Sequence, residues 1–251
     1  MRYAFVLLLL VFVLPLVGQT EFTGARNRDA AILVHMSYGP ELSLADLSDR
    51  FNTNFGIGLG VGYSGKESPW IFSLEGKYYF GSEVNEDVLA GLRTDGGFII
   101  GTNRVPADIN LRMRGLYVGA RVGRIFALGD NPRGGIKVAL GAGYLSHRIR
   151  IQFDPMQTVN QLVGDYRKGY DRLSAGPALS QFIGYYQLSE NGRINFFAGV
   201  ESIQALTTNQ RDYDFATAGT LEEDRLDISL GFRAGLILPL YSGAGEEIFY
   251  R

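Results

Sequence analysis

The sequence predicts an all-β fold, an eight-stranded antiparallel up-and-down transmembrane β-barrel, and three observations support it. Apolar and polar residues alternate along eight separate stretches, as expected of strands that have two different faces. Short connections alternate with long ones, which is typical of a barrel whose long loops all lie at one end. The chain contains 33 Gly, 16 Phe and 14 Tyr in 251 residues, and this composition favours a curved, closed sheet.

The first 18 residues are predicted to be a signal peptide, which leaves residues 19–251 as the barrel domain. Arg2 precedes the apolar run AFVLLLLVFVLPLVG, which contains Pro15 and ends at the small residue Gly18. This run is too short for a membrane-spanning helix and has the composition of a secretory signal. We therefore expect export with cleavage near Gly18, and an uncleaved N-terminal anchor is the alternative.

Composition excludes several classes of function. The chain has no cysteine, so disulfides, iron–sulfur clusters and thiolate zinc sites are excluded. Its formal net charge of −2 gives no basis for binding nucleic acid. The two histidines, His35 and His147, lie far apart in the sequence, so we expect neither a transition-metal site nor any other cofactor.

The first three predicted strands span residues 30–39, 54–64 and 70–80. In the first, AAILVHMSYG, apolar residues recur at every second position. In the second, NFGIGLGVGYS, apolar residues alternate with glycines, so that the glycines share one face of the strand. In the third, WIFSLEGKYYF, aromatic and aliphatic residues alternate with polar ones, including a glutamate and a lysine.

The other five predicted strands span residues 115–126, 136–151, 172–188, 194–206 and 225–241. The sixth strand of the eight, RLSAGPALSQFIGYYQL, alternates poorly, so its faces stay unassigned. The last, RLDISLGFRAGLILPLY, has an apolar residue at every second position. Most of the eight reach the length of about 9–11 residues that crosses a bilayer, whereas strands of soluble proteins are typically about 5–6 residues long.

The connections between these strands are of two kinds. Three are short and rich in turn-forming residues, namely GKESP, ALGDNPRGG and SENGR. Four are longer and more polar, at about residues 40–53, 81–114, 152–171 and 207–224. The stretch GGFIIG in the second long connection is interpreted as a hairpin extension above the membrane. Because the strand number is even, both chain ends are expected at the short-turn end.

Alternation alone does not separate a membrane barrel from a secreted β-sandwich or a soluble lipocalin-like barrel, because each of these folds has two-faced strands. Strand length and the shared face of the glycines favour the membrane barrel, with apolar side chains toward lipid. Aromatic residues near strand ends, where interface girdles lie, favour it further. They are Tyr63, Trp70, Tyr79, Phe80, Tyr144, Tyr185, Tyr186 and Tyr241.

The polar faces then place seven charged residues in the lumen: Glu75, Lys77, Arg121, Lys137, Glu201, Asp227 and Arg233. The interior of an eight-stranded barrel is only wide enough to be filled by side chains. Buried charges must be paired, so these residues are predicted to form a nearly neutral ion-pair network that holds the barrel rigid. A narrow channel with a gated ion path is the alternative.

His35 and Ser37 suggest a second alternative, a lipid-modifying enzyme. Residues two apart on a strand share a face, so the imidazole is able to activate the hydroxyl. The pair resembles the His-x-Ser of lipid A deacylase barrels, which is usually followed by Asn where this chain has Tyr38. Those enzymes turn the pair toward lipid, whereas here it shares the lumenal face, with Glu41 as the one same-face acid. We therefore expect no enzyme activity. His147 is interpreted as a rim residue at the outer end of its strand.

Segments such as RGLYVGARVGRI, KVALGAGYLSHRIRIQ, RINFFAGVE and RLDISLGFRAGLILPLY resemble the small outer-membrane β-barrel proteins of Bacteroidota. The resemblance implies an eight-stranded barrel in the cell outer membrane, in contact with outer-membrane lipid, and it brings no catalytic residues. We expect a non-enzymatic structural or accessory component of the envelope, by analogy a part of a secretion or assembly complex, that acts through its outer loops. GDYRKGYDR and NQRDYDF mix Tyr with Arg and Asp, a composition enriched where envelope proteins would make contact.

Overall fold

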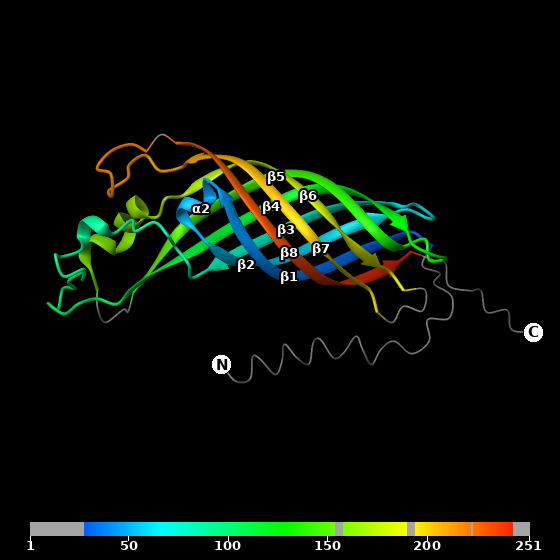
Figure 1. Cartoon of the computed structure of the whole chain (residues 1–251), viewed down its shortest axis with the longest axis horizontal. Helices are drawn as coiled ribbons and strands as arrows, with labels where there is room; N and C mark the ends of the chain where they lie inside the picture. The colour runs from blue at the N-terminus through cyan, green and yellow to red at the C-terminus, as the bar shows by residue number, and fades with distance from the viewer. Residues whose placement is uncertain (1–27, 154–157, 190–193, 222, 243–251) are drawn as a thin grey trace, which may run out of the picture.

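The eight predicted strands form one closed barrel in the computed structural model, which describes residues 28–153, 158–189, 194–221 and 223–242 (Figure 1). Each strand pairs antiparallel with the next along the chain, and the last pairs with the first. The predicted all-β, up-and-down topology is therefore confirmed. The predicted signal peptide lies outside the described residues.

The strands are β1 Ala31–Ala45, β2 Thr53–Ser64, β3 Trp70–Gly81, β4 Ile109–Ala127, β5 Gly134–Phe153, β6 Ser174–Gln187, β7 Phe196–Asn209 and β8 Asp224–Tyr241. The short helices are α2 Leu47–Arg50, η1 Ala90–Leu92, η2 Asn160–Leu162 and η3 Gly164–Tyr170. None of the helices in the described part of the chain is long and apolar enough to cross a membrane.

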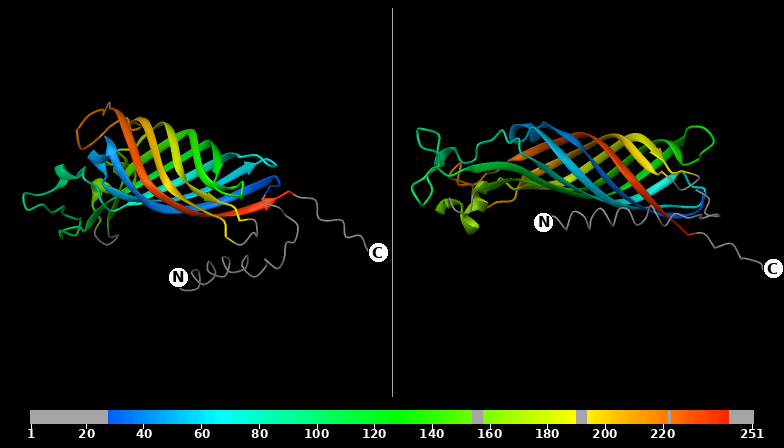
Figure 2. Two further views of the ribbon diagram at one scale, coloured as in Figure 1. Left: turned by 45° about the vertical axis from the view of Figure 1, so that its right-hand side comes forward. Right: turned by 90° about the horizontal axis from the view of Figure 1, so that it is seen from below.

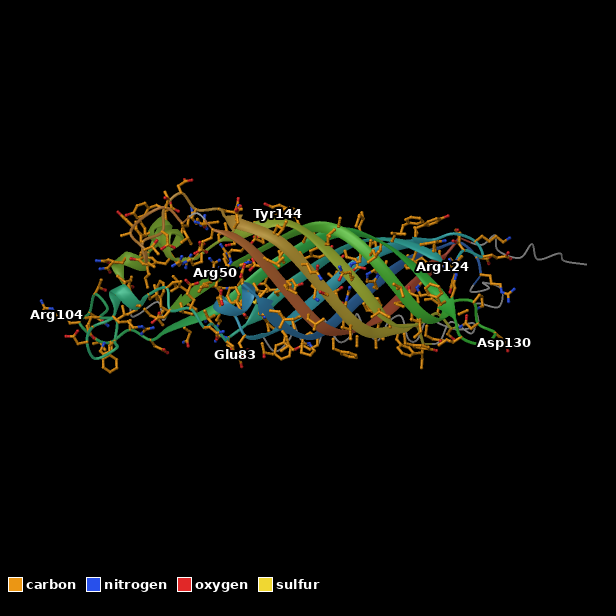
Figure 3. All side chains as sticks on the ribbon, turned by 45° about the horizontal axis from the view of Figure 1, so that its top comes forward. Arg50, Glu83, Arg104, Arg124, Asp130 and Tyr144 are labelled. Carbon is orange, nitrogen blue, oxygen red and sulfur yellow. The ribbon has the colours of Figure 1, made fainter. Side chains whose placement is uncertain are left out.

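All four long connections lie at one end of the barrel and the three short turns at the other (Figures 1 and 2). Figure 3 marks these ends with Arg104 in a long connection and Asp130 in a short turn. The backbone N–H of Ser242 donates to the carbonyl of Ala30 over 2.8 Å. Both described ends of the barrel therefore meet at the short-turn end, which we call the turn end; the opposite end is the loop end.

The first long connection is shorter than predicted. The loop expected at 40–53 is wrong, because β1 continues through Pro40 to Ala45 and only residues 46–52 connect it to β2. Pro40 lies on the outer face, and the register between β1 and β8 omits Gly39 and Pro40, which agrees with the missing N–H of proline. The two strands approach closely at this point. A side-chain carbon at Gly39 would collide with the carbonyl oxygen of Phe232, so only glycine fits there.

Two of the other long connections also shorten, and the third moves by two residues without a change in length. β4 begins at Ile109 and β7 ends at Asn209, which leaves connections at 82–108, 154–173 and 210–223. The hairpin extension expected at GGFIIG is reduced to one antiparallel bridge between Ile100 and Pro106, closed by the hydrogen bonds Gly101 N–H to Val105 O and Ala107 N–H to Ile99 O. Strands that extend past the predicted boundaries lengthen the wall at the loop end.

The interior is filled in three layers. An apolar layer at the turn end contains Leu33, Ile71, Ile125 and Phe197. Charged side chains fill the middle, and a second apolar layer at the loop end joins barrel residues such as Met113 and Ile149 to residues of the connections. The charged side chains in the middle are therefore closed off by apolar packing on both sides.

Candidate functional site

The charged middle layer gathers six ionisable side chains from five strands. Each lies at an inward position of its strand, because side chains alternate between the two faces of a strand. The six are Glu41 from β1, Glu75 and Lys77 from β3, Arg121 from β4, Glu201 from β7 and Arg233 from β8. Three carboxylates thus balance three cations. We call this set the charged layer.

Two carboxylates are each shared by two arginines. Nη1 of Arg233 lies 2.7 Å from Oε2 of Glu75 and 2.8 Å from Oε1 of Glu201. Nη1 of Arg121 lies 2.9 Å from the same Glu75 oxygen and 2.5 Å from the same Glu201 oxygen. Because each carboxylate balances both guanidiniums, removal of any one member leaves a buried charge without its partner.

Lys77 joins the remaining acid to this arrangement. Its ammonium group donates to carboxylate oxygens of Glu41 and Glu201. Ser229 donates to the other oxygen of Glu41 over 2.8 Å. Glu41 was not predicted as a network member, because the first strand was expected to end before Pro40. The sequence does contain a signal for Glu41: it lies an even number of residues from His35 and Ser37, so it shares their face of the strand.

His35 and Ser37 point into the lumen and are engaged by the charged layer. Oγ of Ser37 accepts a hydrogen bond from Nε of Arg233 over 2.7 Å. Nε2 of His35 lies 3.4 Å from Oε1 of Glu75. The exposed fractions of the two residues are only 7% and 4%. The pair is therefore packed within the barrel and both side chains already have polar partners.

Lys137, which was predicted to join the network, makes no ion pair among the described residues. Its ammonium group lies 4.8 Å from the ring centroid of Tyr186, so an aromatic face takes the place of a carboxylate. Both residues line a small cavity beside Glu75 and Arg233, in which the centre of a water molecule has about 10 Å³ of free space. That volume holds about one water molecule.

Asp227 is also separate from the charged layer. It lies six residues from Arg233 on β8, which is about 20 Å along a strand. Nε2 of His147 lies 2.7 Å from its Oδ2, to which Thr207 also donates. His147 is 1% exposed, so its interpretation as a rim residue is wrong. Asp227 therefore shares the inward face of β8 with Arg233 but lies at a different level of the barrel.

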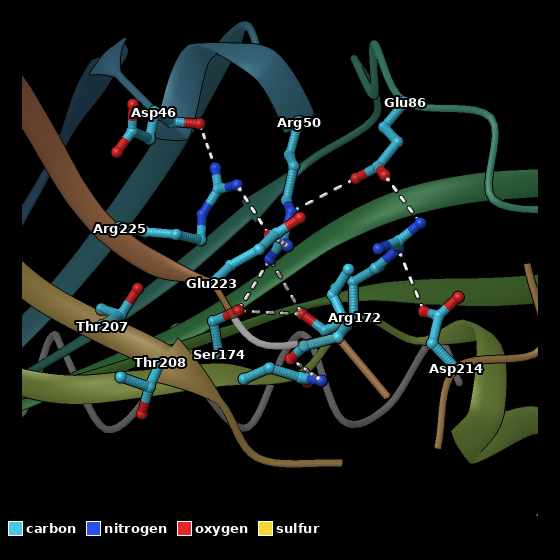
Figure 4. Close-up of polar contacts among 12 residues, drawn as sticks. Asp46, Arg50, Glu86, Arg172, Ser174, Thr207, Thr208, Asp214, Glu223 and Arg225 are labelled. Carbon is cyan, nitrogen blue, oxygen red and sulfur yellow. Dashed lines mark hydrogen bonds and ion pairs between the residues drawn. The ribbon is translucent and has the colours of Figure 1, made fainter. Parts of the chain in front are cut away.

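An ionic cluster ties the four long connections together at the loop end (Figure 4). Arg50 of α2 lies 3.2 Å from Glu86 and 2.9 Å from Glu223, and its Nη1 donates to Ser174 over 2.7 Å. Arg172 lies 3.2 Å from both Glu86 and Asp214. Burial lowers the pKa of Arg50 from its ordinary value, although a guanidinium still stays charged at neutral pH.

Apolar residues of the same connections pack beneath this ionic cluster. They pack with barrel residues at the loop end, such as Met113 and Ile149, and close this end of the barrel. The set includes Leu47, Phe51, Val88, Leu89, Ile99, Val159 and Leu162. Together the ionic cluster and these residues form what we call the cap. Because its parts come from all four long connections, the cap is one packed unit.

The outer wall of the barrel is apolar. Outward residues in the middle of the strands are widely exposed, as with Leu59 at 58%, Leu74 at 67% and Leu140 at 59%. Exposed aromatics such as Tyr63 and Trp70 lie near the turn end of this band. Tyr79 and Tyr186, predicted among the end aromatics, are instead buried in the lumen at 1% and 3% exposure. An exposed apolar band of this kind is typical of the lipid-facing surface of membrane-spanning barrels.

No protein-family model matches the chain, and no curated protein matches its sequence. Among solved structures, the chain is similar to Ail, the attachment invasion locus protein of Yersinia pestis, in complex with the heparin analogue sucrose octasulfate. The identity is 10% over 84% of this chain and 99% of that chain, with a TM-score of 0.43. The outer membrane protein OprG from Pseudomonas aeruginosa is 11% identical over 87% of this chain and 99% of that chain, with a TM-score of 0.36. The outer membrane protein AlkL is 11% identical over 91% of this chain and 99% of that chain, with a TM-score of 0.34. These values carry no argument about function, and membership of the Bacteroidota barrels stays a prediction.

Proposed function

We propose that the chain is an integral β-barrel of the cell outer membrane and a non-enzymatic structural or accessory component of the envelope that acts through its outer loops. The cap carries this proposal. Arg50 and Arg172 tie the four long connections into one unit above a filled lumen. Such a molecule offers a partner a firm loop surface rather than a path through its interior.

The location is supported by the outer wall and by the predicted signal peptide. Leu74 and Leu140 belong to an exposed apolar band that water would solvate poorly. Export through a signal peptide brings a chain with this band to the outer membrane, where short turns face the periplasm and long loops face outward.

The lumen contacts favour neither alternative function. A channel needs a continuous water-filled path, whereas apolar layers close the charged layer on both sides. A hydrolase needs substrate at His35 and Ser37, whereas both side chains are buried and hold Glu75 and Arg233.

An aromatic cluster on the loops supports a partner surface. The ring of Phe215 lies 6.3 Å from that of Tyr166, 5.4 Å from that of Tyr170 and 5.3 Å from that of Tyr213. Tyr166 and Tyr213 are 65% and 45% exposed. Exposed tyrosines beside charged residues are enriched at protein contacts, and here two separate connections bring them together.

Site-specific crosslinking in the native membrane tests this proposal. A photoreactive amino acid replaces Tyr166 or Tyr213, and Leu128 serves as the control because it is 60% exposed in a short turn at the opposite end. The first two positions are expected to capture envelope proteins that the control does not. Recovery of the chain alone from all three positions, or the same proteins from Leu128, would reject the loop surface. Separation of inner and outer membranes tests the location independently.

A further inference from the structure

Four arginines lie on the outer wall at the loop end, where β4 and β5 are paired. They are Arg112 and Arg114 on β4, and Arg148 and Arg150 on β5. They alternate with the inward-facing Met113 and Ile149, which are 2% and 0% exposed, and therefore share the outer face. The register sets Arg112 opposite Arg150 and Arg114 opposite Arg148. We call these four residues the arginine cluster.

The arginine cluster is not neutralised by the described part of the chain. Like charges directly opposite each other on paired strands are destabilising. The one described carboxylate within salt-bridge reach is Asp171, whose Oδ2 lies 3.9 Å from Nη1 of Arg148. Asp171 is already held by Arg211, whose Nε and Nη2 donate to its two oxygens over 2.8 and 2.5 Å. Nε of Arg112 is buried and has no hydrogen-bond partner among the described residues.

Three members of the arginine cluster, Arg114, Arg148 and Arg150, line a groove of about 620 Å³ on the outer wall. Arg167 of η3 is a fourth cation at this groove. Outward residues of three strands, Tyr78, Leu116 and Ser146, form another side of the groove. The groove therefore combines a strongly positive rim with a less polar wall that continues into the lipid-facing band.

The arginine cluster adjoins the aromatic residues at the loop-end edge of that band and lies farther toward the loop end, because cross-strand rows climb around a barrel of tilted strands. Phe55 pairs with Phe80, Phe80 pairs with Arg114, and Arg114 pairs with Arg148, so aromatics and arginines belong to one cross-strand row. The rings of Phe55 and Phe80 stack with their centroids 6.2 Å apart. Aromatic girdles mark the level of lipid headgroups, so the guanidinium groups immediately beyond this edge lie on the headgroup side of the apolar band.

We propose that the arginine cluster and Arg167 bind the phosphate groups of a membrane-lipid headgroup, an inference that rests on the proposed location in the outer membrane. The planar guanidinium forms two parallel hydrogen bonds to a phosphate. Opposed arginines at two successive positions suit a headgroup that carries more than one phosphate. The acyl chains of such a lipid would then lie along the apolar wall below the groove. Free phosphate shares the headgroup chemistry but lacks the contact with this wall.

Binding to the purified full chain in maltoside micelles tests the proposal. The probes are lipid A that carries both phosphates, the same lipid after removal of its phosphates, and inorganic pyrophosphate. The variants are Arg114→Gln/Arg148→Gln, the corresponding double lysine variant, and Arg124→Gln. Arg124 is the matched control, since it lies on the outer face of β4 at the turn end, with its guanidinium carbon 5.6 Å from the ring centroid of Trp70.

We expect tight binding of phosphorylated lipid A, and a loss of about tenfold or more in affinity in the double glutamine variant, because charge-assisted hydrogen bonds are strong. The double lysine variant should fall between this variant and the wild type, and Arg124→Gln should bind as the wild type does. Equal binding of the dephosphorylated lipid, or unchanged binding by the double glutamine variant, would overturn the proposal. If pyrophosphate bound as tightly as lipid A, the acyl chains would contribute nothing and the proposed lipid ligand would be wrong. Binding in micelles tests phosphate recognition wherever the protein is located in the cell. Separation of inner and outer membranes tests the proposed location, so failures of the two proposals can be distinguished.

Discussion

Arg233 on β8 and Glu75 on β3 make a contact of 2.7 Å inside the barrel, although 158 residues separate them in the sequence. The contact passes beneath β2, which presents glycines to the lumen. A side-chain carbon at Gly58 would lie 3.1 Å from Nη2 of Arg233. Because glycine has no side chain, the inward face of β2 leaves room for the charged layer. The glycines of β2 and the charged side chains therefore depend on each other.

Replacement of Arg233 by alanine should destabilise the barrel without opening it. Loss of one member leaves Glu75 and Glu201 with one cation fewer, and breaking a buried ion pair in this way costs about 3–5 kcal/mol. Conductance should stay unchanged because the cap and both apolar layers remain. Denaturant unfolding measures the first effect and planar-bilayer recording the second. Arg124→Ala, on the outer wall, is the control, and a large new conductance in Arg233→Ala would favour the channel.

Replacement of Gly60 by valine should also destabilise the barrel, for a steric reason. A side-chain carbon at Gly60 would overlap the imidazole of His35 and lie 2.9 Å from the carbonyl oxygen of Leu74. Overpacking of this kind typically costs about 1–3 kcal/mol. Gly76 on the neighbouring strand is the control, since its side-chain carbon would meet nothing within 4 Å. Equal unfolding midpoints for the two valine variants would contradict this account of the glycine face.

Replacement of Arg50 by alanine should loosen the cap and leave the barrel intact. The change removes contacts to Glu86, Glu223 and Ser174 and separates connections that otherwise hold each other. Cleavage of the loops by proteinase K should become about 10- to 100-fold faster. This corresponds to about 1.4–2.8 kcal/mol, less than for a fully buried pair, because Glu86 and Glu223 are 28% and 36% exposed. Arg93→Ala is the control, because its pair with Asp87 is exposed at 35% and 41%. Loops that stay as resistant as those of the wild type would show that the cap does not depend on Arg50.

The sequence alone predicts the strands well because alternation is a local property. Each of the eight stretches became a strand, and each predicted lumen residue points inward. The boundaries failed where local signals mislead. Strand β1 continues through Pro40, although proline is disfavoured inside a sheet. Arg112 and Arg114 interrupt the apolar alternation on the outer face of β4, and this strand was expected to begin only at residue 115.

The composition of the charged layer was harder to predict, because alternation fixes the face of a residue and not its height. Asp227 and Arg233 share a face on one strand, yet their partners are His147 and Glu75 at different levels. The level depends on the register of every strand around the barrel, which no single stretch contains. The replacement of Asp227 by Glu41 as the third acid follows from that register.

The orientation of the outer wall gives the most decisive prediction. Leu74 is 67% exposed and lies midway along β3 between Trp70 and Phe80. If this face meets lipid, Leu74→Arg should cost about 2–4 kcal/mol in phospholipid vesicles. On a water-facing surface the same change would stay within about 0.5 kcal/mol. Val105→Arg is the matched control, since Val105 is 48% exposed but lies in a long connection. Equal stability of the two arginine variants would mean that the apolar wall does not face lipid.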